Sequence, residues 1–426
     1  MTDQEKEEVP FIREKIKEKP VNKRKLLKQG SFTVVFAVLF GLVACFVFTL
    51  MQPYMKSWLY PAKEPEIQIP ADELSATEEE SEEEPQETEE KQEVQETVVT
   101  KELELSDYQQ LQNKIYAIGK KANRSVVTVT GVSSDTDWYN NAYESSGQAS
   151  GIIIGDNGPE LLILTEHKAV AEAETISVTF INDVTVTARL KNYDGNTGLA
   201  MLAVQMDEVE QETRDAISYA VLGNSLAVSQ GNIAIAIGSP LGTNYSIGTG
   251  NITSTGNVIQ TLDYNYTVFT TDIVGSRSSS GVLLDLDGEV IGLVMQDYSG
   301  NGEENTLTAI SISDLKKIIE KLSNGRDVAY LGLKVATVTD QIADEYDLPK
   351  GIFIKEVAMD SPALYAGLQT GDIVIEVNGQ KVHTVEEYEE QVLQVQPGDT
   401  VSVAVDRQGM QDYVRMDYEV TAGKLQ

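Results

Sequence analysis

Cysteine and histidine are nearly absent from this chain, which has one cysteine, Cys45, and two histidines, His167 and His383, among 426 residues. A single cysteine excludes an internal disulfide framework and a cysteine-rich metal site. Cys45 lies in an apolar run, where a small buried hydrophobe is the better interpretation than a reactive thiol. We expect no metal and no cofactor.

Basic residues are also scarce, because 33 Lys and Arg stand against 67 Asp and Glu, for a formal net charge of −34. Such a surface repels phosphate backbones, so we expect no nucleic acid partner. Residues 62–106 alone hold 17 acidic and 3 basic residues and few apolar ones. We therefore predict a disordered acidic linker over 52–106 that acts as a solvated spacer. A calcium-binding or partner-binding run is the alternative.

Charge is missing from residues 31–51, which read "SFTVVFAVLFGLVACFVFTLM". About 20 apolar residues cross the hydrocarbon core of a bilayer as a helix, so we predict a transmembrane helix here. Four Lys and Arg residues lie in 23–28, whereas only Lys56 and Lys63 follow nearby. This asymmetry predicts a cytoplasmic segment over 1–30 and a single-pass protein of the cell membrane whose C-terminal domains face outside. A cleaved signal peptide is the alternative, but no A-x-A-like site follows.

Short β-branched runs dominate the sequence after residue 107, among them "SVVTVTGV", "LLILT", "NIAIAIG" and "NTLTAISI". Gly, Asn and Asp turn signals separate them. Closely spaced strands without long helices predict an antiparallel sandwich or a pair of barrels. Residues 311–325 are the exception, since an apolar face at helical spacing predicts one amphipathic helix. That face consists of Leu315, Ile318, Ile319 and Leu322.

Five stretches in order carry a resemblance to a known family: "SGQASGIIIGDNGPELLILTEHKAV", "ARLKNYDGNTGLAMLAV", "IAIGSPLGTNYSIGTGNITS", "TTDIVGSRSSSGVLLDLDGEVIGLV" and "TAISISDLKKIIEKL". With them, residues 107–325 resemble the trypsin-like protease domain of the bacterial HtrA (DegP-like) family. The resemblance extends to about residue 420. It implies a mainly β fold with a trypsin-like double antiparallel β-barrel, serine endopeptidase chemistry and a homo-oligomer, commonly a trimer.

The base and its orienting group depart from the family pattern. The family histidine stands three residues after the threonine that ends the "LT" strand, here Thr165, so Lys168 occupies its position. His167 falls one place early, and a one-residue step turns a side chain by about 100–180°. Gly198 stands at the aspartate position and cannot orient an imidazole, while Asp194 lies four residues upstream.

The nucleophile position also departs from the family pattern. In "GSRSSSGVLL" it corresponds to Ser279, with Ser280 as a near alternative, and Arg277 stands where the family has an oxyanion-hole glycine. The sequence therefore predicts a protease fold that has lost most or all hydrolysis. A dyad of Ser279 with Lys168, or a shifted His167, is the alternative. The dyad requires a lysine pKa lowered from about 10.4 toward neutrality.

Residues 329–420 resemble a PDZ domain, with "YLGL" at 330–333, "SPALYAGLQTGDIVIEVNGQKV", a helix from Val385 to about Val395, and "PGDTVSVAVDRQG". A PDZ domain binds the extended C-terminus of a peptide by adding it as a strand to a sheet edge. The resemblance implies that the backbone amides of the 330–333 loop hold the terminal carboxylate. His383 is expected to be an exposed loop residue. The candidate peptide-binding residues are Tyr330, Leu331, Gly332, Leu333, Val335, Tyr388 and Val392.

These features together predict a membrane-anchored HtrA-like pseudoprotease that binds exposed peptide C-termini or unfolded proteins through its PDZ domain. The alternative is an active serine endopeptidase in envelope protein quality control.

Overall fold

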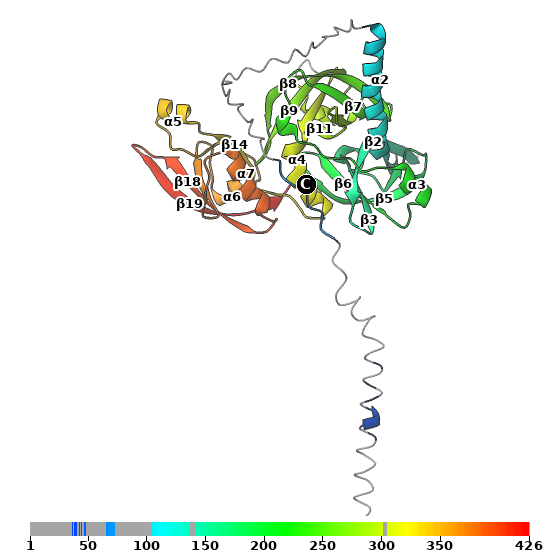
Figure 1. The fold of residues 1–426 in the computed structure, drawn as a ribbon. Coiled ribbons are helices and arrows are strands. Elements are labelled where there is room, and N and C mark those ends of the chain that lie inside the picture. Colours follow the sequence, from blue (N-terminus) through cyan, green and yellow to red (C-terminus); the bar gives the residue numbers. More distant parts are fainter. Residues whose placement is uncertain are drawn as a thin grey trace, which may run out of the picture. The chain divides into compact units, whose positions relative to one another are not determined.

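The protein divides into two compact units, residues 1–63 and 64–426. The computed structural model describes residues 65–72, 104–136, 142–300 and 305–425, and seven residues between 36 and 47 (Figure 1). Those seven are helical and exposed, but the predicted membrane helix over 31–51 otherwise lies outside the described residues. No helix within the described part of the protein is long and apolar enough to cross a membrane. The membrane helix therefore stays a prediction.

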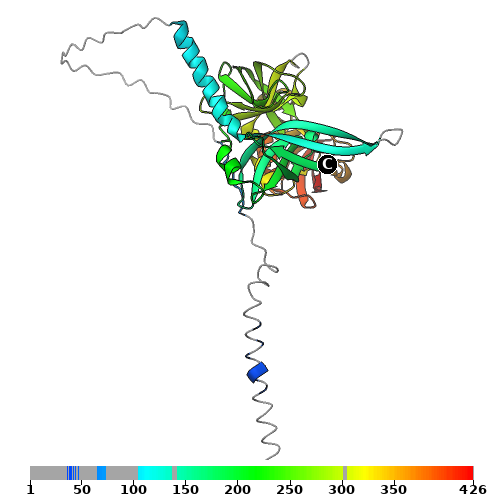
Figure 2. The same cartoon turned by 90° about the vertical axis from the view of Figure 1, so that its right-hand side faces the viewer.

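Two closed antiparallel barrels of six strands each form the centre of the second unit, which confirms the predicted double barrel. The first barrel has the strand order β1-β2-β3-β6-β5-β4. Figure 2 shows β1 and β2 as a long pair of strands. The bounds are β1 (Val126–Thr136), β2 (Ala142–Asp156), β3 (Glu160–Glu166), β4 (Thr175–Thr179), β5 (Thr185–Asp194) and β6 (Leu199–Gln205).

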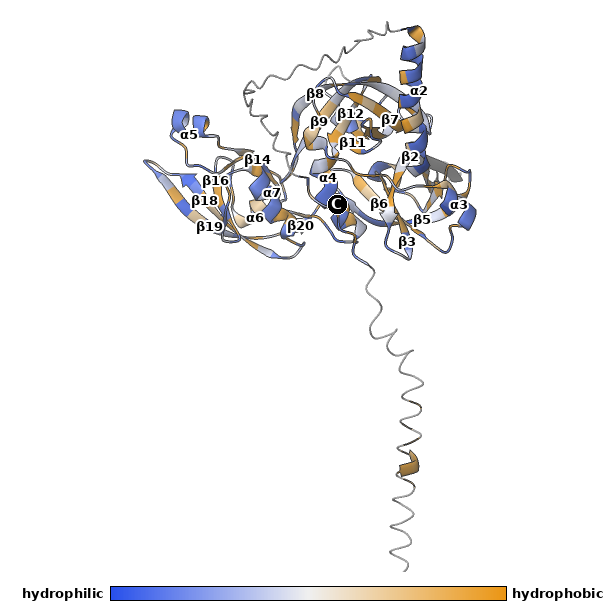
Figure 3. Cartoon of the chain, viewed as in Figure 1, coloured by the Kyte–Doolittle hydropathy of each residue, from blue (hydrophilic) through white to orange (hydrophobic). Residues whose placement is uncertain are grey.

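The second barrel has the order β10-β11-β12-β9-β8-β7. All residues of β10 and β11 are buried, because apolar side chains on both faces pack against neighbouring elements. Figure 3 shows hydrophobic colour on strands of both barrels and hydrophilic colour on the small helices α3 and α5. The bounds are β7 (Ile233–Ser239), β8 (Ser246–Gln260), β9 (Asn265–Val274), β10 (Ser280–Leu284), β11 (Val290–Met295) and β12 (Thr306–Ser311).

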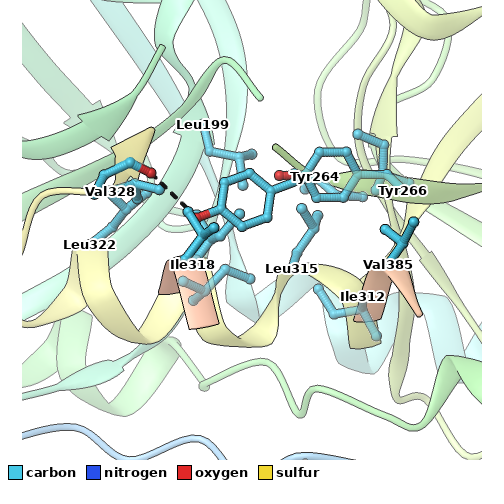
Figure 4. Packing of buried hydrophobic residues seen from close by; sticks show 14 of the residues in the cluster. Leu199, Tyr264, Tyr266, Ile312, Leu315, Ile318, Leu322, Val328 and Val385 are labelled. Carbon is cyan, nitrogen blue, oxygen red and sulfur yellow. Dashed lines mark hydrogen bonds between the residues drawn. The ribbon is translucent and has the colours of Figure 1, made fainter. Parts of the chain in front are cut away.

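The amphipathic helix predicted over 311–325 is α4 (Ile312–Ser323). Its predicted apolar face, Leu315, Ile318, Ile319 and Leu322, is buried in the largest hydrophobic cluster of the molecule (Figure 4). Gly325 follows it at φ 66°, a backbone conformation that glycine adopts without strain. The other helices of this region are α2 (Leu105–Ala122), α3 (Gln211–Ala216) and the 3-10 turns η1 (Asn123–Ser125), η2 (His167–Ala169), η3 (Ser225–Ala227) and η4 (Gln296–Tyr298).

Residues 65–72 lie along α4, although they fall within the range 52–106 assigned above to an unstructured linker. The backbone N–H of Ile67 donates to Asn324 Oδ1 at 2.9 Å, and Asn324 Nδ2 donates back to the Ile67 carbonyl at 2.8 Å. Lys316 Nζ lies 2.6 Å from Asp72 Oδ1, and both side chains are largely buried. A segment with acidic composition is therefore held against the folded domain by paired contacts that composition alone does not indicate.

The C-terminal domain contains the sheet β14-β15-β16-β18-β19, with β17 paired to β16, and a separate β13-β20 pair. The predicted helix from Val385 is α7 (Val385–Gln394), which Thr384 and Glu387 begin with a reciprocal capping box. The bounds are β13 (Ala329–Tyr330), β14 (Leu333–Thr337), β15 (Ile352–Val357), β16 (Ile373–Val377), β17 (Gln380–Lys381), β18 (Thr400–Gln408), β19 (Tyr413–Thr421), β20 (Gly423–Lys424), α5 (Asp340–Tyr346) and α6 (Pro362–Ala366).

Candidate active site and peptide-binding loop

Lys168, predicted at the position of the catalytic base, lies in η2 directly after β3. Its Nζ forms ion pairs with Glu166 Oε2 at 2.6 Å and with Asp297 Oδ2 at 3.1 Å. Burial alone would lower the pKa of Lys168, but the carboxylates of Glu166 and Asp297 outweigh burial and raise it. A lysine accepts a proton only in its neutral form, so this amine is held in the form that cannot act as a base.

Ser279, predicted at the nucleophile position, is 1% exposed. Its hydroxyl donates to the carbonyl oxygen of Pro240 and accepts from the backbone N–H of Ser276 at 2.7 Å. The backbone N–H of Ser279 donates to the Ser276 carbonyl at 2.9 Å. Both the hydroxyl and the amide that an oxyanion hole would use are therefore already bonded to other groups of the protein. The neighbouring Ser280 lies in β10, where its hydroxyl accepts from the N–H of Ser150 at 2.9 Å.

Two observations on the structure disfavour the dyad, which stays a prediction. Among the described residues, no hydrogen bond or ion pair joins Lys168 to Ser279 or Ser280. The pKa of Lys168 is also raised rather than lowered. The physical reason is that the amine faces the carboxylate of Glu166 and, in addition, that of Asp297, which follows β11.

His167 is packed in a way that suits a structural role. Its ring stacks on Tyr193 with centroids 4.0 Å apart and planes 2° apart, and burial lowers its pKa. Asp194 does not orient this ring, because its carboxylate accepts from the N–H and hydroxyl of Thr197 at 3.0 and 2.7 Å. Gly198 has φ 76° and its carbonyl accepts the His167 N–H at 2.7 Å. The shifted-base hypothesis therefore lacks an orienting carboxylate here.

A polar cavity of about 250 Å³ lies beside these residues, lined by Arg277, Gln296, Asp297 and Ser299. Asp297 is the same carboxylate that holds Lys168. The lining is polar and charged, so the cavity suits a polar group better than a large apolar side chain.

The loop at 330–333 already contacts a carboxylate, and this carboxylate comes from the protein itself. The backbone N–H groups of Leu331 and Gly332 donate to Asp263 Oδ2 at 2.7 and 2.8 Å, and that of Leu333 donates to Oδ1 at 3.1 Å. Gly332 has φ 95°, which lets consecutive amides point into one concave anion site. A Cβ at this glycine would also lie 2.3 Å from Ser361 Cβ.

The apolar residues predicted to line the peptide pocket converge on the same place. Leu333, Val335, Tyr388 and Val392 are each 0% exposed and belong to one hydrophobic cluster. The Tyr388 hydroxyl donates to Asp263 Oδ1 at 2.6 Å. Tyr330 lies at the edge, half-buried in β13. His383 is exposed before α7, where its backbone N–H donates to Glu387 at 2.6 Å.

Asp263 is the site residue that sequence reasoning missed. It lies between β8 and β9 in "TLDYN", has φ 64° and is 0% exposed. The sequence offers only a turn signal there, since Asp tolerates left-handed backbone in turns. Nothing local indicates that this aspartate is buried against amides some 70 residues later.

Residues 149–293 match the trypsin-like peptidase domain family and residues 329–417 match the PDZ domain family. The protein belongs to the HtrA family. Over 287 residues this HtrA-family protein is 30% identical to a probable periplasmic serine endoprotease DegP-like of Hahella chejuensis, covering 66% of this chain and 58% of that one. It is 27% identical to the serine protease Do-like HtrB of Bacillus subtilis over 314 residues, covering 66% of each. The protein thus spans less than two thirds of the length of these relatives.

Solved structures agree on the fold. The HtrA-type protease AlgW with a decapeptide superposes with a TM-score of 0.52 at 23% identity, covering 72% of this chain and 98% of that one. The same protease with a tripeptide gives a TM-score of 0.52 at 24% identity, covering 72% and 96%. At these identities the likeness concerns the fold alone.

Proposed function

We propose that this HtrA-family protein is a membrane-anchored pseudoprotease of the cell envelope that binds exposed peptide ends or misfolded proteins through its PDZ domain. One observation carries the loss of catalysis: the Ser279 hydroxyl and amide are bonded to Pro240 and Ser276. The amine of Lys168, at the base position, stays protonated because it forms ion pairs with two carboxylates. The anion-binding amides of the 330–333 loop support retained recognition of a carboxylate.

Fluorophosphonate labelling and casein hydrolysis by the detergent-solubilised full-length protein test the loss of catalysis. We expect neither labelling nor turnover above the background of the Ser279→Ala variant. Ser280→Ala and Lys168→Ala should then behave like the parent. Labelling of the parent that disappears in Ser279→Ala or Ser280→Ala would overturn the pseudoprotease proposal.

An active serine endopeptidase in envelope quality control is the second candidate, favoured by the serine protease names of both relatives. It would require the 276–279 loop to release the Ser279 hydroxyl and amide. Serine-dependent turnover lost in Lys168→Ala would identify a dyad, and turnover lost in His167→Ala a shifted base. Turnover that appears only on adding peptide would place the rearrangement under PDZ control.

The proposed location and assembly rest on the sequence and the family. The apolar run 31–51 would anchor the protein with its domains outside, as the periplasmic relative's name suggests. Protease accessibility of the C-terminal domains in intact and permeabilised spheroplasts tests this orientation. A homotrimer is the assembly expected from the family, and light scattering in detergent would measure it.

A further inference from the structure

Asp263 reproduces the contacts that a peptide terminus makes in an anion-binding PDZ loop. Its side-chain carboxylate receives the three amides of Leu331, Gly332 and Leu333. Its own backbone N–H donates to the Leu333 carbonyl at 2.6 Å, which is the first hydrogen bond of a strand added beside β14. One residue of the barrel domain therefore supplies both a carboxylate and a strand-like backbone bond.

Neighbouring residues form further contacts between the two domains on both sides of Asp263 and bury it. The Tyr388 hydroxyl donates to Asp263, and the Asn265 N–H donates to Glu389 Oε1 of α7 at 2.6 Å. Tyr264 and Tyr266 pack above α4 in the same cluster as Val385 of α7 (Figure 4). Because Asp263 is 0% exposed, no external carboxylate reaches the three amides while these contacts hold.

We propose that Asp263 is an internal ligand of the PDZ domain, which competes with peptide C-termini for the amides of the 330–333 loop. Peptide then binds only to the fraction of molecules in which residues 261–265 have left the loop, and its apparent affinity falls in proportion to that fraction. This inference rests on the proposed peptide-binding function and adds an intramolecular control to it.

Burial of the Asp263 carboxylate opposes its docking in the loop. Burial raises the pKa of Asp263, although hydrogen bonds from Gly332, Tyr388 and the neighbouring amides oppose that rise. The Asp263 carboxylate loses hydration when it docks, as a peptide terminus would, so a peptide that makes additional strand contacts can compete with it.

Peptide binding to the full-length protein tests the proposal. The probes are fluorescein-labelled octapeptides ending in Val, Leu or Phe, each as free acid and as C-terminal amide, measured by anisotropy. Asp263→Asn keeps the shape of the side chain but loses the charge-assisted hydrogen bonds. The free-acid peptides should therefore bind the variant at least about tenfold more tightly than they bind the parent. The peptide amides should bind weakly to both the parent and the variant, because they lack the carboxylate that the loop recognises.

Asp272→Asn is the matched control, since Asp272 is an exposed aspartate of β9 whose carboxylate accepts from Asn251. It should bind the peptides as the parent does. Tyr388→Phe removes one hydrogen bond to Asp263 and should give a smaller gain in affinity for the free acids. It replaces Asp263→Asn in the test if that variant does not fold. Equal affinity of the parent and Asp263→Asn for the free acids would overturn the proposal.

Hydrogen exchange of the Leu331, Gly332 and Leu333 amides separates the two proposals. Faster exchange in Asp263→Asn than in Asp272→Asn supports the internal ligand whether or not a peptide binds. Faster exchange with no binding of any octapeptide would support the internal ligand and overturn the peptide-binding function. Unchanged exchange together with no binding would overturn both.

Discussion

The barrel loop around Ser279 and the PDZ loop at 330–333 both point their donors at groups of the same protein. In the barrel, the partners of Ser279 are the adjacent turn residue Ser276 and the Pro240 carbonyl. In the PDZ domain, the partner is Asp263, which lies 68 to 70 residues from the amides that bind it. One contact is made chiefly inside a tight turn, and the other between two domains.

This difference affects how readily the bonded groups of each site can be released for a substrate or a peptide. Releasing Ser279 requires breaking both its turn contacts with Ser276 and its bond to the Pro240 carbonyl, and Lys168 would still face two carboxylates. Releasing the PDZ amides requires residues 261–265 to leave the loop, at a place where both domains contribute to one hydrophobic cluster. We expect the Ser279 site to stay closed and the PDZ amides to become accessible when residues 261–265 leave the loop.

The largest expected effect comes from comparing Gly332 of the PDZ loop with Gly198 of the first barrel. Gly332→Ala places a Cβ 2.3 Å from Ser361 Cβ at φ 95°, so we expect a loss of about 3 kcal/mol in unfolding free energy. In Gly198→Ala the new Cβ lies no closer than 3.8 Å to another atom, so only the backbone strain at φ 76° remains, and we expect a loss of about 1 kcal/mol in unfolding free energy. Urea unfolding of the two variants measures the contrast, and equal losses would contradict it.

The second prediction concerns pH at the interface between the domains. Burial raises the pKa of Glu389 to about 8, with Glu386, Asp314 and Asp263 adding like charge and the Asn265 N–H opposing the rise. In the undocked state Glu389 would have the ordinary pKa of 4.5, so as pH rises it loses its proton in that state before it does so in the docked state. Docking should therefore weaken as pH rises from about 4.5 to about 8 and change no further above that.

Exchange of the 330–333 amides at pH 6 and pH 8, corrected for the intrinsic rate, measures this weakening. Glu389→Gln should reduce the pH dependence, while the buried Asp263 and Asp314, whose pKa values burial also raises, keep part of it. Stronger protection at pH 8 than at pH 6 would contradict the prediction.

The third prediction treats Ser279 as a structural residue. Ser279→Ala leaves the Pro240 carbonyl and the Ser276 N–H without this partner, and we expect a loss of about 1–2 kcal/mol in unfolding free energy. Ser278→Ala is the control, since Ser278 is exposed and its hydroxyl pairs with the Ser276 hydroxyl at 3.1 Å. A Ser279→Ala variant as stable as Ser278→Ala would indicate that the hydroxyl is not needed by the loop.

The smallest effect is expected for Lys168→Met. The Lys168 side chain is 47% exposed, and a half-exposed ion pair contributes about 0–1 kcal/mol. The buried partner Glu166 already has a pKa raised by burial, so it can take a proton when the amine is lost. A loss of several kcal/mol on thermal or urea unfolding would refute this interpretation.

Local patterns in the sequence predicted much of the architecture. The 3.6-residue period of Leu315, Ile318 and Leu322 predicted α4, and alternating β-branched runs predicted the strands of both barrels. Composition misled at residues 65–72, because an average over an acidic stretch hides Ile67 and Ile69, which pack against the core. A few apolar residues at the right spacing suffice to hold such a segment against the protein when the helix that they contact is already formed.

The sequence by itself determined which chemical groups stand at each candidate site: His167 and Lys168 after β3, Gly198 before β6, and the backbone amides of the 330–333 loop. Only the tertiary structure decided which groups meet. The pairing of Lys168 with Asp297 joins residues 129 positions apart, and Asp263 reaches its amides across two domains. Such contacts depend on how barrels close and domains dock, and no short-range period or turn signal encodes that geometry.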